Sequence, residues 1–302
     1  MEKQRTIKDW IVATRPWSLT ASAIPVLAVT AYIWWRDMGS GTELNWLNAV
    51  LSLIMLVMLQ QTGNLIGDYY DHKKGVDKKE YCPNGVTWIH SGLFEPEEIL
   101  HYGYTMLSIA AAIGLGILVN SSWEAVWLGV AGLLMVYFYP WLKAHALGDV
   151  DVLFGYALLP ALGVSFVTTG RWIWDTMLVS LTYGLITVAI LHANNTRDID
   201  NDHGAGLNTL CIAIGLKVSQ WLYIAEILMP YLLIIILYFC DILPIWSFLT
   251  FLSLPVAITN CRKMLPSKGV ELQIATLDQQ TAKLQMMFGL LMTVSFVVAR
   301  FV

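Results

Sequence analysis

The feature that most constrains this chain is a succession of apolar segments, each long enough to cross a lipid bilayer. A transmembrane helix needs about 20 consecutive, predominantly apolar residues. Because unpaired backbone groups are costly in lipid, such segments cross as helices. Nine segments meet the requirement, near residues 17–36, 45–66, 98–120, 123–142, 150–169, 174–193, 218–239, 242–260 and 282–301. We therefore expect an all-α integral membrane protein with about nine transmembrane helices, in a single domain over residues 1–302.

Composition agrees with a membrane protein and argues against other classes. Charged residues make up 13% of the 302 residues and hydrophobic residues 57%, whereas a soluble domain carries about 25% charged residues. The formal net charge of -4 argues against nucleic acid as a partner, because nucleic-acid-binding surfaces are basic. The four cysteines form no CxxC pair, so we interpret them as packing residues rather than a disulfide or zinc framework.

Lysine and arginine are distributed unevenly between the two ends of the apolar segments. If nine spans alternate in direction, one side receives only Arg36, Arg171 and Arg300 of the 18 Lys and Arg residues. The positive-inside rule places the other side, which includes the N-terminus, in the cytoplasm. We therefore expect a protein of the cytoplasmic (inner) membrane, with two long polar loops, near 67–97 and 194–217, on the cytoplasmic side.

Two acidic motifs each follow an apolar segment on that side. The first has spacings of four and three residues: Asn64, Asp68 and Asp71. The second has spacings of four and four residues: Asn194, Asp198 and Asp202. Either spacing places the three side chains on one face of a helix. The two motifs therefore present two acidic faces at one membrane surface, and these faces repel each other unless a cation lies between them.

The residue types of the motifs indicate the cation and its ligand. Carboxylate and amide oxygens suit Mg²⁺, which commonly binds through one or two carboxylates together with substrate phosphates. Nearby basic side chains can neutralise the remaining phosphate charge: Lys73, Lys74, Lys78, Lys79 and Arg197. The apolar spans can accommodate a hydrocarbon chain. The pattern thus indicates a lipid with a diphosphate head group as the substrate.

Each of these features also has a plainer interpretation. An acidic run at a helix end is usually a solvated face, and lysines there can be membrane anchors; the matched pair of motifs favours the metal site. Asp77 and Asp200 are either ligands or surface residues, with Asp77 favoured. Glu226 lies inside the seventh segment and is either functional or a protonated packing residue. Five histidines lack metal-ligand spacing and are expected to be structural or exposed: His72, His90, His145, His192 and His203.

At these residues the chain resembles the UbiA family of membrane prenyltransferases. Within the family it is most similar to the branch that prenylates 1,4-dihydroxy-2-naphthoate in menaquinone biosynthesis. Four parts of the sequence carry the resemblance: residues 15–26 (RPWSL, then IPV), 64–77 (the first motif), 194–210 (NNxRDxxxD and the following TL) and 281–291 (TAKL, then FGLL).

The resemblance implies a fold and a set of site residues. It implies nine helices around a central cavity, with the active site beneath cytoplasmic loops. It implies Mg²⁺ bound by the four expected catalytic carboxylates: Asp68, Asp71, Asp198 and Asp202. Tyr139 is expected to stabilise an allylic cation with its ring. The full set of expected substrate contacts is Arg15, Asn64, Lys73, Lys74, Asp77, Lys78, Tyr139, Lys143, Asn194 and Arg197.

The expected function is Mg²⁺-dependent transfer of a polyprenyl group from polyprenyl diphosphate to an aromatic acceptor, with 1,4-dihydroxy-2-naphthoate as the expected acceptor. Other acceptors used in the family are alternatives: 4-hydroxybenzoate, homogentisate or a glycerol phosphate lipid. Two further alternatives are a family member that binds the donor without catalysis and a cation transporter. A transporter predicts charges near the bilayer midplane and interrupted helices, whereas these motifs lie at the ends of the apolar segments.

Overall fold

The computed structural model describes residues 5–37, 43–74, 88–89, 92–204, 206–266 and 274–302. These residues form helices and contain no β-strand, which confirms the all-α class. The helices of the first half are α1 (Ile7–Ala13), η1 (Pro16–Ser18), α2 (Thr20–Arg36), α3 (Trp46–Lys74), α4 (Pro96–Val119), α5 (Ala125–Ala144) and α6 (Gly148–Leu153). Those of the second half are η2 (Phe154–Leu158), α7 (Leu159–Thr169), α8 (Asp175–Arg197), α9 (Ile199–Gly204), α10 (Leu210–Ile214), α11 (Leu216–Phe239), η3 (Ile245–Ser253), α12 (Leu254–Met264) and α13 (Leu277–Phe301).

Six helical segments among the described residues are long and apolar enough to cross a membrane: Trp46–Tyr70, Pro96–Val119, Gly148–Thr169, Asp175–Arg197, Leu216–Phe239 and Leu277–Phe301. They indicate an integral membrane protein. The other three expected spans coincide with α2, α5 and the pair η3–α12. Of these, α2 has only 17 residues, and η3 is a 3₁₀ helix that changes to α-helix where Pro255 occupies the first turn of α12. The count of nine membrane-crossing helices stays a prediction.

The ends of several helices follow from their local sequence. Pro96 occupies the first turn of α4, where its missing N–H costs nothing, and Glu95 and Glu98 form a reciprocal capping box there. Gly170 ends α7 with a left-handed φ of 71°, a conformation that glycine adopts at little steric cost. No proline or glycine ends α3 and α8 where their apolar segments stop. Both helices therefore extend four or more residues beyond those segments, into the acidic motifs.

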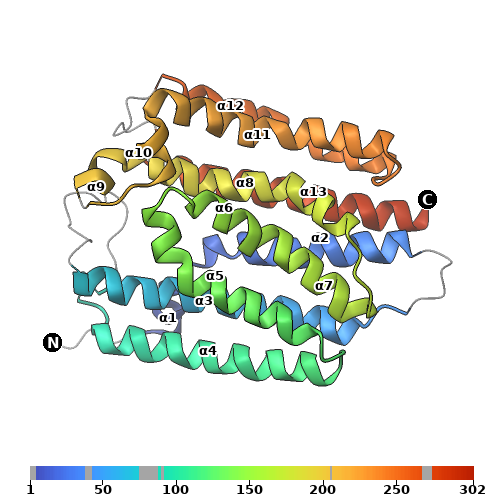
Figure 1. Ribbon diagram of the computed structural model, residues 1–302, viewed down its shortest axis with the longest axis horizontal. Helices are drawn as coiled ribbons and strands as arrows, with labels where there is room; N and C mark the ends of the chain where they lie inside the picture. Colours follow the sequence, from blue (N-terminus) through green and yellow to red (C-terminus); the bar gives the residue numbers. More distant parts are fainter. Residues whose placement is uncertain (1–4, 38–42, 75–87, 90–91, 205, 267–273) are drawn as a thin grey trace.

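The bundle is organised around α8 and α13. Helix α13 packs against α2 and α8, and α11 packs against α8. In Figure 1, α11 and α12 form one outer layer and α4 the opposite one, with α8, α13 and α2 between them. The largest fully buried side chains of the main core come from these central helices and α11: Tyr32, Tyr183, Tyr223, Phe288 and Phe296. A Cβ atom at Gly289 of α13 would lie 2.2 Å from Ile24 Cγ2 of α2, so the close approach of these helices requires glycine.

The two ends of the bundle carry different residues. At one end, Arg36 Nη1 donates to the Asp241 carbonyl oxygen at 3.0 Å, and Arg171 pairs with Asp37 at 2.9 Å. The Arg300 guanidinium lies over the Trp34 ring, 5.5 Å from its centroid. The three arginines that the sequence assigns to the cation-poor side therefore lie at one end. The C-terminal end of α3, with the first acidic motif, and helix α9, with the end of the second, both lie at the other end of the bundle (Figure 1).

Candidate active site

The first acidic motif lies on one face of α3, as its spacing predicts, and this face contacts the turn between α1 and α2. Asn64 Nδ2 donates to the Thr14 carbonyl oxygen and to Ser18 Oγ, each at 3.0 Å. One turn further on, Asp68 is only 4% exposed and forms an ion pair with Arg15. Asn64 and Asp68 therefore hold the N-terminal segment against α3. The side chains of Asp71 and Lys74 and all of Asp77 and Lys78 lie outside the described residues.

Arg15 reaches Asp68 because the backbone turns sharply between α1 and η1. Its φ and ψ angles are 54° and 62°, in the left-handed region that costs a non-glycine residue about 1 kcal/mol or more. The following Pro16 disfavours the right-handed helical region for Arg15. The sequence predicts Arg15 as a substrate contact, and the structure places its guanidinium on a motif carboxylate. Arg15 thus compensates the charge of a buried carboxylate at the predicted site.

The second acidic motif is organised by Arg197, the last residue of α8. Its Nε donates to Asp198 Oδ1 at 2.9 Å and its Nη2 donates to Asp198 Oδ2 at 2.8 Å. The same guanidinium bonds the Asn194 amide oxygen and the Ala275 carbonyl oxygen before α13, the latter at 3.1 Å. This two-bond arrangement fixes the orientation of a carboxylate as well as its charge. The structure therefore places Arg197 on the motif's own side chains.

Asp202 keeps the spacing of the motif although α8 ends at Arg197. The backbone N–H of Asp198 bonds the Asn194 carbonyl at 3.0 Å, and that of Asp202 bonds the Asp198 carbonyl at 2.8 Å, so the helical repeat continues into α9. One carboxylate oxygen, Oδ2, is buried and has no hydrogen-bond partner among the described residues. Burial raises the pKa of Asp202, and the nearby Lys143 ammonium opposes that rise. Asp202 Oδ2 is therefore a buried carboxylate oxygen that could bind a cation.

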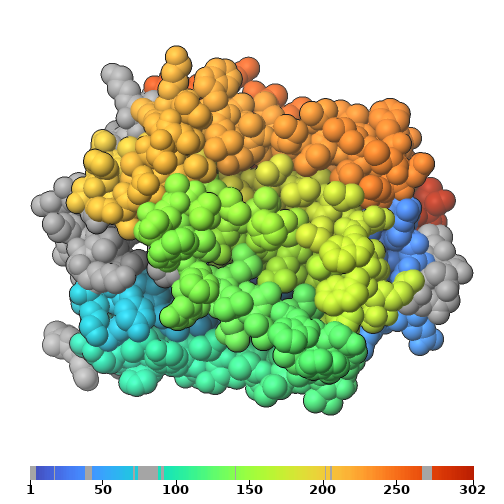
Figure 2. Space-filling model, in the orientation of Figure 1, coloured from blue at the N-terminus to red at the C-terminus, as the bar shows by residue number. Residues whose placement is uncertain are grey.

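Lys143 lies in the last turn of α5 and Tyr139 one turn before it, and this end of α5 lies at the same end of the bundle as the motifs (Figure 1). Lys143 lies near enough to Asp202 for its positive charge to lower the pKa of that carboxyl. Figure 2 shows the surface hollowed between the green residues of α5 and α6 and the cyan end of α3. Lys73 is exposed, and its ammonium lies 5.7 Å from the Tyr69 ring centroid on its own helix. The predicted contacts of Lys143 and Lys73 with the substrate stay predictions.

The donor atoms at this end suit a hard divalent cation. Asp68, Asp198 and Asp202 offer only carboxylate oxygens, the ligands that Mg²⁺ prefers. An ionised carboxylate has about four lone-pair positions, so the bonds from Arg197 leave acceptor capacity on Asp198. The unpartnered oxygen of Asp202 supplies a direct reason for a cation, because a buried polar atom without a partner is costly. The residues present therefore fit Mg²⁺.

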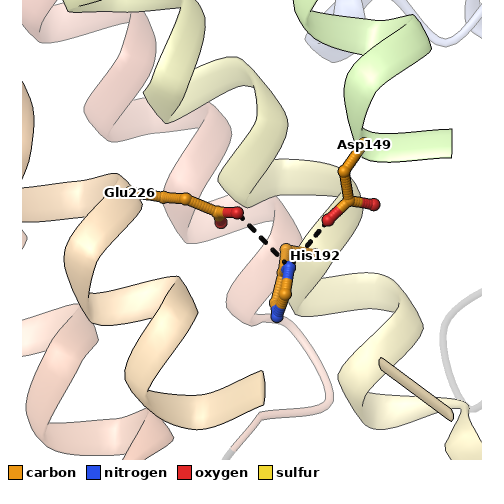
Figure 3. Close-up of side chains that lie close together, drawn as sticks. All are labelled: Asp149, His192 and Glu226. Atoms are coloured by element: carbon orange, nitrogen blue, oxygen red, sulfur yellow. Dashed lines mark hydrogen bonds and ion pairs between the residues drawn. The ribbon is translucent and has the colours of Figure 1, made fainter. Parts of the chain in front are cut away.

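A third cluster, which the sequence does not predict, lies deeper in the bundle. Asp149 of α6, His192 of α8 and Glu226 of α11 point toward one another (Figure 3). His192 Nδ1 is 2.8 Å from Asp149 Oδ2 and 3.4 Å from Glu226 Oε1. Only Glu226 carries a signal in the sequence, because it is a carboxylate within an apolar span. Asp149 and His192 lie far from it in the sequence and match no motif.

Comparison with known proteins decides the family. The model of the UbiA prenyltransferase family matches residues 22–269. The chain belongs to this family. The predicted family and the predicted enzyme class, prenyltransferase, are thereby confirmed. The match includes most of the helices and both acidic motifs, whereas Arg15 precedes the matched residues.

Relatives of this UbiA-family chain include proteins from animals and bacteria. UbiA prenyltransferase domain-containing protein 1 of Xenopus tropicalis is 30% identical over 296 residues, covering 96% of this chain and 82% of that protein. Its Drosophila melanogaster homologue is 31% identical over 299 residues, covering 96% and 79%. The 1,4-dihydroxy-2-naphthoate octaprenyltransferase of Bacillus subtilis is 26% identical over 301 residues, covering 95% and 92%.

Solved structures share the fold. A UbiA homologue from Aeropyrum pernix superimposes with a TM-score of 0.69 at 15% identity, covering 93% of this chain and 97% of that one. A UbiA homologue from Archaeoglobus fulgidus, bound to DMAPP and Mg²⁺, superimposes with a TM-score of 0.58 at 14% identity, covering 94% and 99%. The predicted UbiA-type fold is thereby confirmed.

Proposed function

We propose that this UbiA-family enzyme transfers a polyprenyl group from polyprenyl diphosphate to an aromatic acceptor, with Mg²⁺ at the two acidic motifs. The observation that carries this proposal is the position of both motifs at one end of an apolar bundle, with a buried, unpartnered carboxylate oxygen on Asp202. The Archaeoglobus fulgidus homologue bound to DMAPP and Mg²⁺ has the same fold, which supports a prenyl diphosphate donor and this metal.

Asp68, Asp198 and Asp202 would hold the cation, together with Asp71 from its position in the first motif. Bound Mg²⁺ supplies positive charge that stabilises a diphosphate as a leaving group. Arg15 and Arg197 keep two of the carboxylates in place through their ion pairs. Because these arginines cancel part of the negative charge, the motifs can approach a common substrate without strong mutual repulsion.

Other residues act on the substrate directly in this proposal. Lys143, whose charge acts on Asp202, contacts the diphosphate beside the metal and neutralises part of its charge. Tyr139 lies one turn before Lys143 on α5, so that its ring faces the allylic carbon as positive charge develops there. The apolar helices bind the prenyl chain and exclude water, which would otherwise capture the cation. The allylic carbon–oxygen bond breaks and diphosphate leaves, while a ring carbon of the acceptor forms the new carbon–carbon bond. With dihydroxynaphthoate as the acceptor, that ring carbon then loses its carboxylate as carbon dioxide.

We propose 1,4-dihydroxy-2-naphthoate as the acceptor and the cytoplasmic face of the membrane as the site of reaction. The acceptor is supported by the Bacillus subtilis relative, whose name states that acceptor and which matches 95% of this chain. The orientation is supported by the gathering of Arg36, Arg171 and Arg300 at the end opposite the motifs, because cytoplasmic loops carry the excess of positive residues.

A prenyl-transfer assay in detergent tests the proposal. Polyprenyl diphosphate and Mg²⁺ are supplied with one of four acceptors: 1,4-dihydroxy-2-naphthoate, 4-hydroxybenzoate, homogentisate or geranylgeranylglycerol phosphate. The expected result is a prenylated product with dihydroxynaphthoate alone, abolished by EDTA. If a product forms with one of the other acceptors and not with dihydroxynaphthoate, the proposed acceptor is wrong but the proposed reaction class stands. Turnover that is unaffected by EDTA contradicts the metal-dependent site.

A further inference from the structure

We propose that Asp149, His192 and Glu226 form a second cation site, separate from the Mg²⁺ site, which binds a first-row divalent transition metal ion such as Zn²⁺. The three side chains come from α6, α8 and α11 and converge inside the bundle (Figure 3). All three are more than nine-tenths buried, with exposed fractions of 6%, 0% and 7%. The site joins three helices that are far apart in the sequence.

The separations between the donor atoms suit one small cation. One donor atom from each residue lies within 4.8 Å of the others, and His192 Nδ1 is 2.8 Å and 3.4 Å from the two nearest carboxylate oxygens. Bond lengths to Zn²⁺ of about 2.0–2.2 Å in tetrahedral geometry place ligands about 3.4 Å apart. Side-chain movements of about 1 Å or less therefore bring all three to ligand distance. Three protein ligands leave a fourth position for water.

The environment of His192 prepares Nδ1 as a ligand atom. Its other ring nitrogen, Nε2, lies 3.0 Å from the Ser219 carbonyl oxygen and 2.8 Å from Ser219 Oγ. A carbonyl oxygen only accepts hydrogen bonds, so Nε2 carries the hydrogen and neutral imidazole directs the Nδ1 lone pair toward the two carboxylates. Thr196 supports this arrangement, with its hydroxyl 2.7 Å from Ser219 Oγ. Metal-bound histidines have this kind of second partner, which sets the tautomer and the ring orientation.

The unpartnered carboxylate oxygens, together with the buried negative charge, favour a divalent cation over protons. Two buried carboxylates beside a neutral imidazole carry two negative charges, and buried charges without compensation are strongly unfavourable. Asp149 Oδ1 and Glu226 Oε2 are also buried without a hydrogen-bond partner among the described residues. Protons on His192 Nδ1 and on Glu226 would cancel the same two charges, but they would provide no partner for Asp149 Oδ1 and Glu226 Oε2. A divalent ion cancels both charges, and a water in its fourth position can donate to a free oxygen.

The imidazole nitrogen distinguishes this site chemically from the acidic motifs. Mg²⁺ prefers oxygen ligands and retains several waters, whereas a histidine with two carboxylates suits Zn²⁺ and related ions, which bind imidazole well. His192 lies two residues before Asn194 on α8. A metal bound there would hold α8 against α6 and α11 directly beneath the second motif. We therefore expect this ion to stabilise the bundle and to support the position of Arg197 and Asp198.

Metal binding by the full-length protein in detergent tests the site. The protein is stripped with a chelator, incubated with Zn²⁺ alone, freed of unbound ions and analysed by elemental mass spectrometry. Wild type is expected to retain about one Zn²⁺ per chain. Glu226→Gln and Asp149→Asn, which nearly conserve shape, are expected to bind Zn²⁺ at least tenfold more weakly. Glu124→Gln, at an exposed position, is the matched control. Asp202→Asn removes a carboxylate of the other site, and both of these variants are expected to bind as wild type.

Either of two results overturns the proposal. Glu226→Gln retains as much Zn²⁺ as wild type, or the wild-type protein retains no Zn²⁺ after it is reloaded. If Glu226→Gln does not fold, Co²⁺ added to Asp202→Asn decides the question. Absorption bands in the visible region that titrate to about one ion per chain and disappear on addition of Zn²⁺ support a low-coordinate site with a nitrogen ligand. Absence of such bands contradicts it and leaves a protonated His192 between the carboxylates.

Discussion

Replacing Arg197 with lysine distinguishes between two roles for this residue: holding Asp198 in place and contacting the diphosphate. In the structure, Arg197 makes two bonds to Asp198 and further bonds to Asn194 and the Ala275 carbonyl oxygen. Lysine keeps the charge but cannot form the planar two-bond arrangement. The Arg197 side chain is only 22% exposed, so water can replace the lost hydrogen bonds only in part. We expect Arg197→Lys to misplace Asp198 and thereby weaken Mg²⁺ binding.

The size of the effect follows from the bonds that are lost. A hydrogen bond to a charged group contributes about 1.5–3 kcal/mol, and losing a residue that orients a metal ligand commonly costs about 10–100-fold in metal affinity. We therefore expect the Mg²⁺ concentration for half-maximal rate to rise about 10–100-fold, equivalent to about 1.4–2.7 kcal/mol. Because Arg197 acts through Asp198 here, the KM for the donor at saturating Mg²⁺ should change by less than about threefold.

The assay is steady-state prenyl transfer with Mg²⁺ varied at saturating donor, and then with donor varied at saturating Mg²⁺. Arg262→Lys is the matched control, since Arg262 is exposed near the C-terminal end of α12, and it should behave as wild type. A large rise in the donor KM with an unchanged Mg²⁺ requirement would refute this reasoning. That result would restore the direct phosphate contact which the sequence predicts.

Two further predictions concern packing and pH. Gly289→Ala should lower the free energy of unfolding by about 1–3 kcal/mol, because the new Cβ would meet Ile24. Gly129→Ala is the control and should leave the free energy of unfolding unchanged, because its Cβ would enter open space. Thermal unfolding in detergent compares the two variants. The pKa of Asp202 is raised above its ordinary value of 3.8. Without Mg²⁺, the folded state therefore becomes less stable as the pH rises above that value, because the buried carboxyl must lose its proton. Asp202→Asn should then unfold at a higher temperature than wild type at pH 7, with a difference that shrinks toward pH 4; equal unfolding temperatures at pH 7 would contradict the buried carboxylate.

The sequence predicts the helices and the motif faces well because both depend on local information. Apolar length and helical spacing act within one segment, and α3 carries Asn64 and Asp68 on one face, as expected. The partners of these faces are long-range. The sequence contains no signal that Arg15, 53 residues before Asp68, would turn through a left-handed backbone to reach it. The sequence predicts Arg15 and Arg197 as substrate contacts, and it does not reveal that both arginines pair with motif carboxylates.

The buried cluster illustrates the same limit. Asp149 and His192 are 43 residues apart, and only the folding of α6, α8 and α11 onto one another brings them to Glu226. The sequence does mark Glu226, because a carboxylate within an apolar span is costly unless it is paired. It leaves the partner open, since helix rotation decides which polar side chain faces it. The 3₁₀ geometry of η3 is also unpredicted, because composition does not separate it from an α-helical span.

The most direct test of the central claim is the Mg²⁺ dependence of prenyl transfer in Asp68→Asn, Asp198→Asn and the double variant. If both motifs hold the metal and diphosphate together, each single variant should lose about 100-fold or more in rate at saturating Mg²⁺. The double variant should be little worse than either, because groups that act as a unit are not additive. All three proteins should remain folded in the membrane. Wild-type rates in both single variants at saturating Mg²⁺ would contradict a metal site shared between the two motifs.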